Sequence, residues 1–414
     1  MNLNQHFKDA STEFSSAFNE ASERIAQPEA SFFFDREFVL KAAGEAKLPG
    51  EATDLLLRFL EKLSGEKELC RTISALHELC FGTKPMSPGT WPEFSGTLLE
   101  NEAAVNLLLV LSGFPNVHRK YDARKIPQEV LDDTLADIPL WLKRLKMDDG
   151  TIGLSRRILS WLFGHFSADL YRLGRLQFCP LGKFNYAFRI YRNKKNKRVL
   201  ALAEDGTSVD AAGFLTQKDE EPAWKASLSI TEKEIRGFPT DPQGLISREP
   251  ICLDASEWTE AIAKGAAVLD VHIPEGEALS VEACRDSFEK ALRFFLEHYP
   301  ELDFKAFTCT SWLFDPVFLK ILKPSSNILS FYKEFYCVPY HHGICTNETL
   351  RRVFGKDRER LDEAPKDTSM KKAIFEHYKN GGVFRESGAF ILMDEISTYG
   401  QENYWNDFQK AREP

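Results

Sequence analysis

The sequence contains few features of disulfide-stabilised or membrane proteins. Its eight cysteines, at positions 70, 80, 179, 252, 284, 309, 337 and 345, form no CxxC pair, which in a chain of 414 residues indicates free thiols in a reducing compartment. The longest apolar run, around residues 107–111, is too short to span a bilayer, and no secretory signal is visible at the N-terminus. We therefore expect a cytoplasmic protein without a membrane span.

Excess positive charge and the common catalytic motifs are also missing. The formal net charge of −9 argues against broad, sequence-blind nucleic-acid binding, which requires an excess of basic residues. There is no GxSxG, no GxxxxGK[ST], no HExxH and no GxGxxG after a strand. These absences exclude hydrolase elbows, P-loop nucleotide hydrolysis, zincin proteolysis and the usual dinucleotide oxidoreductases.

The chain reads as a helical half followed by a mixed half. With 43% hydrophobic and 12% aromatic residues it can bury large cores, and residues 38–166 follow a helical pattern almost throughout. From Gly174 the pattern changes to strands, with a hairpin whose turn is at residues 193–197. Further strands are expected in the following ranges: 176–178, 184–191, 199–203, 224–230, 335–340, 350–354 and 389–393. A helix is expected over residues 368–378.

One stretch organises the second half. Residues 268–273 form an apolar run, residues 280–299 have helical spacing, and residues 304–311 form a second extended run. Asp315 and Pro316 then open another helix. Strand, helix and strand in this order predict a parallel crossover, and open sheets bind ligands where such strands end. We expect the active site at this edge.

Several strings resemble a bacterial family of N-acyltransferases that has a helical N-terminal domain and a GNAT-like C-terminal domain. The matching strings are YRLGRLQF (171–178), SREP (247–250), VHIPEG (271–276), SWLFDP (311–316), SN (326–327), DTS (367–369) and GG (381–382). The resemblance implies an α+β chain with an all-helical domain over residues 1–172. A GNAT-like mixed α/β domain with a central twisted sheet follows over residues 173–405.

The resemblance implies acyl transfer from acyl-CoA, or a similar thioester, to an amine by direct attack. Such a site needs a base for the amine, an amide for the oxyanion and an acid for the departing thiolate. His272, at a strand end, is the proposed base, because a histidine has an ordinary pKa near 6.5. Glu275 is the second choice of base, and Tyr332 or Tyr336 is the proposed acid.

The expected co-substrate site follows the first strand. Gly276 and Ser280 would hold acyl-CoA at the helix N-terminus, with no permanently bound cofactor. GNAT enzymes usually place a glycine-rich loop here, whereas residues 274–279 contain one glycine and two acids, which would repel a diphosphate. The alternative function is therefore a catalytically inactive GNAT-fold module that binds a small ligand or a protein partner.

The remaining candidates lie on and after the second strand. Cys309, Ser311, Trp312 and Asn327 are proposed to contact substrate. Cys309 is also weighed as a nucleophile with His272 as its base, against the favoured interpretation as a buried core residue. No metal site is predicted, because the histidines at 341–342 and the cysteine at 345 have no matching ligand pair in sequence range. The basic run at 189–198 is interpreted as a solvated turn rather than a nucleic-acid surface. The expected partners are a small-molecule acyl donor and an amine acceptor.

Overall fold

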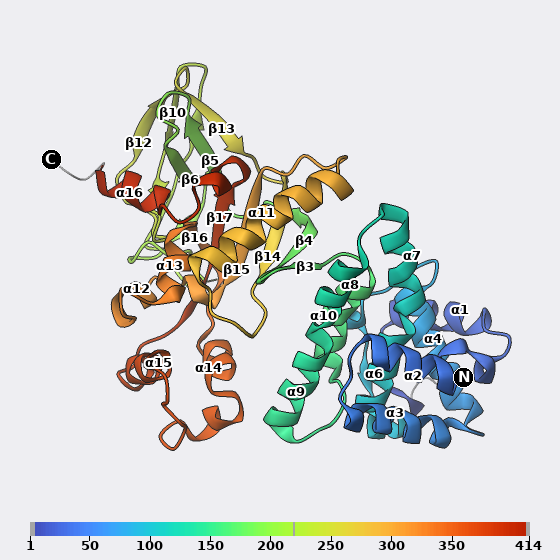
Figure 1. Ribbon diagram of the computed structural model, residues 1–414. Coiled ribbons are helices and arrows are strands. Elements are labelled where there is room, and N and C mark those ends of the chain that lie inside the picture. Colours follow the sequence, from blue (N-terminus) through green and yellow to red (C-terminus); the bar gives the residue numbers. More distant parts are fainter. Residues whose placement is uncertain (1–4, 218–219, 411–414) are drawn as a thin grey trace. The chain divides into compact units, whose positions relative to one another are not determined.

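The computed structural model describes residues 5–217 and 220–410, apart from the side chains of Asp149, Leu181, His341 and His342. The chain divides into two compact units, Met1–Arg172 and Leu173–Pro414 (Figure 1). Within the described ranges, none of the helices combines the length and the apolar character that crossing a bilayer requires.

The first unit is built from helices, joined by one short antiparallel pair, β1 (Phe7–Lys8) with β2 (Glu93–Phe94). The helices are α1 (Thr12–Glu23), η2 (Pro28–Ala30), η3 (Phe32–Phe34), α2 (Arg36–Glu45), α3 (Gly50–Leu63), α4 (Lys67–Phe81), η4 (Pro88–Thr90), α5 (Gly96–Glu100), α6 (Glu102–Ser112), α7 (Phe114–Arg124), α8 (Gln128–Leu135), α9 (Asp137–Asp149) and α10 (Arg156–Phe166). Helix α6 is buried along nearly its whole length, as its almost continuous apolar sequence predicts. The helical expectation for this half of the chain is confirmed.

The second unit contains a six-stranded sheet of order β16-β17-β15-β14-β4-β3 and smaller antiparallel sheets of order β11-β6-β5-β13, β12-β10-β9 and β7-β8. The strands are β3 (Tyr171–Leu173), β4 (Leu176–Lys183), β5 (Phe188–Asn193), β6 (Val199–Ala203), β7 (Ser208–Val209), β8 (Trp224–Lys225), β9 (Ser229–Ile230), β10 (Glu234–Gly237), β11 (Pro239–Thr240), β12 (Ile251–Asp254), β13 (Trp258–Ile262), β14 (Ala267–His272), β15 (Ala306–Ser311), β16 (Tyr336–Ile344) and β17 (Arg385–Leu392). The helices are α11 (Val281–His298), η5 (Trp312–Phe314), α12 (Phe318–Ile321), α13 (Asn327–Lys333), α14 (Thr346–Phe354), η6 (Gly355–Arg360), α15 (Ser369–Lys379), η7 (Met393–Thr398) and α16 (Asn403–Lys410). The mixed α/β expectation is confirmed.

The predicted crossover is present. Strands β14 and β15 pair in parallel, and α11 between them lies across the six-stranded sheet (Figure 1). The buried Phe288 of α11 contacts Phe307 of β15 and Phe178 of β4, with ring centroids 4.8 and 5.8 Å apart. These contacts identify the face of the sheet that α11 covers.

Two local predictions were wrong. Residues 350–354 belong to helix α14 rather than to a strand, because Leu350 and Phe354 are four residues apart and both face an apolar core. Glu348 supports the helix by ion pairs with Arg351 and Arg352, at 2.6 and 2.8 Å. The expected single strand at 224–230 is two separate two-residue strands, β8 and β9.

A buried carboxylate joins the end of β15 to the start of β17. Asp315 is 3% exposed and accepts the backbone N–H groups of Val317 and Arg385, at 2.9 and 2.6 Å. Burial raises the pKa of Asp315 to about 6, although both hydrogen bonds favour the ionised form. Folding therefore favours the protonated carboxyl.

This shift predicts a pH dependence of stability. An aspartate in the unfolded chain ionises near pH 4, so the folded state is favoured most below that pH and loses up to about 3 kcal/mol as pH rises through 6. Asp315→Asn should flatten the change in unfolding free energy between about pH 4 and 7, measured by urea titration. The exposed Asp303→Asn is the matched control and should leave the slope unchanged. Equal slopes in wild type and Asp315→Asn would contradict this assignment.

Candidate functional site

The parallel pair opens at its C-terminal end. Register between β14 and β15 runs from Val268 opposite Ala306 to Asp270 opposite Thr308 and then stops. Each strand keeps its outer neighbour beyond this point, because β14 pairs with β4 as far as His272 and β15 pairs with β17 as far as Ser311. The two strands therefore diverge over their last residues, in the middle of the sheet. This opening is the candidate site.

Polar side chains share one face of the sheet beside the opening. Residues on a strand alternate between faces, so Asp270 and His272 point to the side opposite α11, together with Thr308 and Thr310. Thr308 donates its hydroxyl hydrogen to the Asp270 carboxylate across the last paired position. The face that α11 leaves uncovered is therefore polar at the point where the strands separate.

Asp270 is the most informative residue of this face. Burial raises the pKa of its carboxyl, and the hydrogen bond from Thr308 opposes that shift. A Cβ added at Gly182 of β4 would lie 2.9 Å from Asp270 Oδ2 and 2.7 Å from the Val268 carbonyl oxygen, so the absence of a side chain there makes room for the carboxyl. A half-buried carboxyl with a perturbed pKa at a sheet edge is a marker of a functional site.

A phenol extends the polar face towards β17. The buried Tyr186 and the exposed Thr310 are joined by a hydrogen bond of 3.0 Å between their hydroxyl oxygens. A Cβ at Gly388 would lie 2.7 Å from the Tyr186 ring, so this ring packs directly on the backbone of β17. Burial raises the pKa of Tyr186, which keeps the phenol neutral.

The loop between β14 and α11 is held from inside the protein. Arg175, which is 8% exposed, donates from Nε to the Glu277 carbonyl oxygen at 2.7 Å and from a terminal nitrogen to the Pro274 carbonyl oxygen at 2.9 Å. Gly276 has a φ of 144°, which residues with a side chain rarely adopt. Ser280 caps α11 by accepting the Ala283 N–H at 3.2 Å. Gly276 and Ser280, the residues predicted to hold acyl-CoA, thus belong to a loop whose backbone is fixed by these contacts.

The loop's own amides and one of its acids face solvent. Gly276, Glu277 and Ala278 are exposed, and in the described part of the chain their backbone N–H groups donate no hydrogen bond. The Glu277 carboxylate likewise makes no hydrogen bond among the described residues, so it does not occupy the N-terminus of α11. Glu275 is exposed too. Bare amides at the start of a long helix are what an anionic group requires.

The structure separates Cys309 from His272. Cys309 is 2% exposed and follows Thr308 on β15, so its side chain points to the face that α11 covers, opposite His272. Burial also raises the pKa of the Cys309 thiol, which disfavours a thiolate. The proposed Cys309–His272 pair is therefore not formed. Ser311 is at the end of the same strand, where its hydroxyl oxygen accepts the Leu313 N–H at 3.2 Å.

The remaining predicted residues lie on other elements. Trp312 of η5 packs its ring 5.8 Å from that of Phe318, against the apolar core of α12, α14 and α15, and Asn327 is exposed at the start of α13. Tyr332 is fully buried and donates its hydroxyl hydrogen to the Gln243 carbonyl oxygen at 2.9 Å. Burial raises the pKa of Tyr332 well above its usual value, so this phenol is engaged and shielded rather than open to a leaving group.

Tyr336, the other proposed acid, is enclosed in the same way. Its side chain is 2% exposed and its hydroxyl donates to the Thr240 carbonyl oxygen. Burial raises its pKa as well. Both phenol hydroxyls are thus engaged with backbone carbonyls inside the protein.

Three residues of the site were not predicted: Asp270, Arg175 and Gln177. Gln177 is opposite His272 in the β4–β14 register and is 1% exposed, and within the part of the chain that the structure describes its amide nitrogen has no hydrogen-bond partner. Asp270 did leave a signal in the sequence, because an aspartate inside the apolar run of residues 268–273 is out of place in a buried strand. Arg175 and Gln177 lie in the string YRLGRLQF, which carries the family resemblance but does not by itself indicate their roles.

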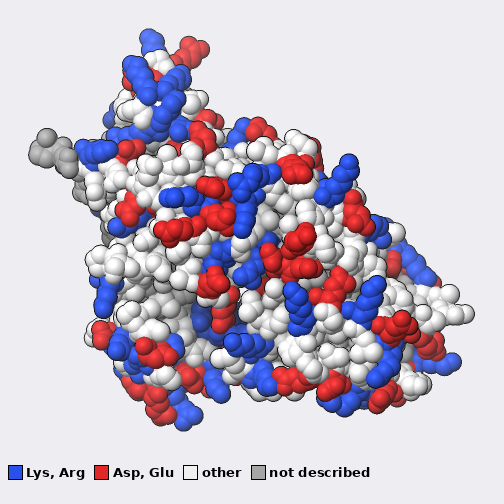
Figure 2. All heavy atoms as spheres, viewed as in Figure 1, with Lys and Arg blue, Asp and Glu red and all other residues white. Residues whose placement is uncertain are grey.

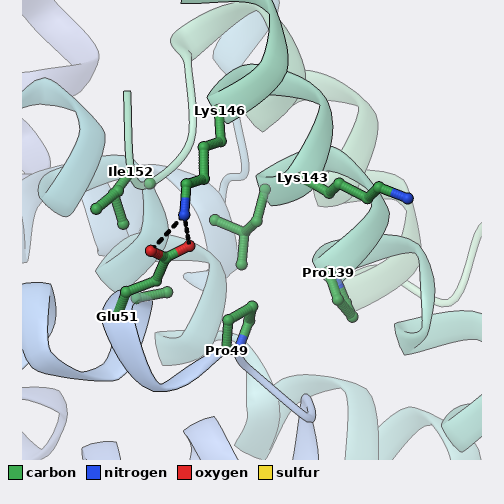
Figure 3. Close-up of a pocket in the computed structure, with 9 residues that line it drawn as sticks. Pro49, Glu51, Pro139, Lys143, Lys146 and Ile152 are labelled. Carbon is green, nitrogen blue, oxygen red and sulfur yellow. Dashed lines mark hydrogen bonds and ion pairs between the residues drawn. The ribbon is translucent and has the colours of Figure 1, made fainter. Parts of the chain in front are cut away.

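A separate apolar cavity lies within the first unit. Its volume is about 400 Å³, and it is lined by Pro49, Glu51, Ala52, Pro139, Leu142, Lys143, Lys146, Ile152 and Gly153. Figure 3 shows Lys146 reaching Glu51 across one side, with contacts of 2.5 and 2.7 Å, while Lys143 extends away from this pair. Besides this ion pair, the titratable side chain of the lining is that of Lys143, which points away from the pair, so we assign the cavity no catalytic role.

The basic hairpin is balanced by acids. Arg192 pairs with Asp394 and Glu395 at 2.5 and 3.1 Å, and Lys195 pairs with Glu257 at 2.5 Å. Figure 2 shows basic and acidic side chains together over this face of the molecule. These pairs fit a solvated turn better than a nucleic-acid surface. Among the described residues, no group of three or more His, Cys, Asp or Glu side chains is placed to hold a metal ion.

The open parallel pair followed by a capped helix defines a GNAT-like acyltransferase fold, and the comparisons agree. The GNAT-like C-terminal domain matches residues 170–391, and the N-acyltransferase N-terminal domain matches residues 40–168. The chain therefore belongs to the family of N-acyltransferases with a GNAT-like C-terminal domain.

Solved structures of similar fold are also acyltransferases. One, in complex with CoA and 10C-teicoplanin, is 19% identical with a TM-score of 0.61, and the match covers 92% of this chain and 94% of that one. A second, in complex with decanoyl-CoA and teicoplanin, is 20% identical with a TM-score of 0.59, covering 86% and 87%. A mutant acyltransferase in complex with octanoyl-CoA is 20% identical with a TM-score of 0.59, and the match covers 86% of this chain and 88% of that one. The comparison with curated proteins gave no match.

Proposed function

We propose that this chain transfers an acyl group from acyl-CoA to an amine by direct attack at the open end of β14 and β15. The observation that carries the proposal is the divergence of the parallel pair after Asp270 and Thr308, with the bare amides of the following loop beside it. Family membership and the acyl-CoA named in the similar structures support the donor. The proposal that the acceptor is an amine is based on the polar face, where His272 could take up the proton that an amine loses.

In the proposed reaction His272 acts as the base, and Asp270 stabilises its protonated form. The acceptor nitrogen attacks the thioester carbon, and His272 takes the proton that the nitrogen loses. The C–S bond then breaks and the CoA thiolate takes up a proton, so an amide and CoA are the products. Asp270, two residues before His272 on the same face, is about 7 Å away along the strand. In its ionised form it would stabilise the imidazolium by about 2 kcal/mol.

The other predicted residues take supporting places in this proposal. Gly276 and Ser280 shape the loop and helix end that receive the diphosphate. Glu275 is the alternative base, on the exposed side of the same loop. Ser311 ends the strand on the other side of the opening, near where the acyl or acceptor group would lie. Tyr332 is not given the acid role, because its hydroxyl is bonded to a backbone carbonyl.

Thermal stabilisation by CoA, acetyl-CoA and longer acyl-CoAs tests the donor. A ligand at about a hundred times its dissociation constant stabilises by roughly 2.7 kcal/mol, which moves the melting temperature of a protein this size by a few degrees. We expect CoA and its thioesters to shift the melting temperature, and a shift that grows with chain length would define an acyl site. A chain that no member stabilises would contradict acyl-CoA as donor. Binding without amide formation from any amine would instead support an inactive binding module.

A further inference from the structure

The loop after β14 lacks the glycine-rich sequence that usually exposes amides to a diphosphate, yet among the described residues the N–H groups of Gly276, Glu277 and Ala278 donate no hydrogen bond. Residues 274–279 contain one glycine and two glutamates. We therefore expect a residue outside the loop to fix the orientation of its peptide groups. Among the described contacts, the side chain that enters it from another element is that of Arg175, which comes from the turn between β3 and β4.

Arg175 sets the direction of two peptide groups at once. Its guanidinium accepts no hydrogen bond and presents donors in a rigid fork, so it draws the carbonyls of Pro274 and Glu277 towards itself. The described residues contain no cis peptide bond, and in a trans peptide the C=O and N–H groups point in opposite directions. The N–H groups of Glu275 and Ala278 therefore point away from Arg175, towards the outside of the loop.

The turn that holds Arg175 is itself tied to α11. The Arg175 backbone N–H donates to Ser287 Oγ at 2.7 Å, about two helical turns beyond the N-cap Ser280. The arginine is thus fixed relative to both ends of the loop. Its positive charge also lies beneath a loop that carries two acids, which offsets part of their repulsion towards an anion.

A second observation at the same strand end indicates a ligand. Gln177, two residues after Arg175 on β4, is 1% exposed, and its amide nitrogen has no hydrogen-bond partner among the described residues. Leaving such a donor unpaired costs free energy, which a bound acceptor group would recover. Gln177 is directly opposite His272, two residues before the loop begins.

Building on the proposed function, we propose that Arg175 is the positioning residue of the CoA diphosphate site. It replaces the glycine-rich sequence by holding two carbonyls inward, so that the opposite amides and the bare N–H groups of the loop face the diphosphate. The buried arginine thereby exposes backbone N–H groups to the diphosphate, which in other GNAT enzymes is the role of the glycines of the loop. The specificity it confers is for the diphosphate rather than for the acyl group.

The test compares ligands with and without the diphosphate. Arg175→Met should weaken binding of CoA by about 10- to 100-fold, the size expected for charge-assisted contacts. It should leave binding of pantetheine, which lacks the diphosphate, unchanged in the same calorimetric titrations. Arg175→Lys keeps the charge but not the fork, and should restore little of the affinity. Arg156→Met is the matched control, because Arg156 donates to the carbonyls of Trp91 and Pro92 in the first unit.

The outcomes separate this inference from the proposed function. Unchanged CoA affinity in Arg175→Met, or an equal loss for CoA and pantetheine, overturns the role of Arg175 while leaving acyl-CoA chemistry intact. A wild-type chain that binds no CoA overturns both. If the variants do not fold, hydrogen exchange of the wild type decides: CoA should protect the amides of residues 276–278, and unprotected amides in the CoA complex would refute the site.

Discussion

Replacing His272 by glutamine is expected to lower kcat for acyl transfer by about 10²- to 10⁴-fold while leaving CoA binding unchanged. The reason is that glutamine keeps the polar contacts of the strand end but cannot accept the amine proton at neutral pH. In wild type, kcat/KM should rise with pH through the ionisation of this base, and the variant should lose that limb. Steady-state rates over a pH series, with calorimetric CoA titration, measure both effects.

Asp270→Asn is the companion variant. If the carboxylate stabilises the imidazolium, its removal should slow transfer by about 10- to 100-fold and move the limb in the pH profile to lower pH, because a nearby negative charge raises the pKa of a histidine. A larger loss in Asp270→Asn than in His272→Gln would assign the base to Asp270 instead. Full activity in His272→Gln would contradict the proposed base outright.

The largest effect on stability is expected from Phe288→Ala. This side chain is fully buried between α11 and the sheet, with ring contacts to Phe178, Phe307, Phe335 and Tyr399. Removing a buried phenylalanine costs about 3–5 kcal/mol through lost apolar burial and the cavity that remains. Leu296→Ala on the same helix is the matched control, because Leu296 is 74% exposed and should change the unfolding free energy by less than about 0.5 kcal/mol.

Urea unfolding of both variants measures this difference. Similar midpoints for Phe288→Ala and Leu296→Ala would show that α11 does not pack on the sheet through Phe288. Because α11 also carries the capped start that follows the loop, a loosened helix should weaken CoA binding as well. Phe288→Ala should therefore lower both the unfolding free energy and CoA affinity, whereas the effect expected of Arg175→Met is on CoA affinity.

The crossover was predictable because its signals are local. Ser280 caps its helix as the sequence predicts, and the apolar spacing from Val281 onward gives the face that packs on β4 and β15. Residues 350–354 were predicted as a strand because five residues with apolar ends do not distinguish the two structures. Their helical state depends on ion pairs and on a core supplied by α12 and α15.

The site was predictable only in part. His272 could be proposed from the sequence because it ends a strand whose neighbours are nearby in sequence, whereas Asp270 acquires its partner Thr308 from 38 residues away. Arg175 reaches carbonyls 99 and 102 residues further along the chain. The same long-range contacts enclose Tyr332, whose hydroxyl bonds to a carbonyl 89 residues earlier. Such pairings depend on the sheet order, which no local pattern contains.

A crystal structure of the chain with CoA would test the central claim most directly. The account predicts the diphosphate on the amides of residues 276–278, the pantetheine between the diverging ends of β14 and β15, and the sulfur near His272. CoA bound elsewhere, for example in the apolar cavity beside Glu51 and Lys146, would contradict the proposed active site.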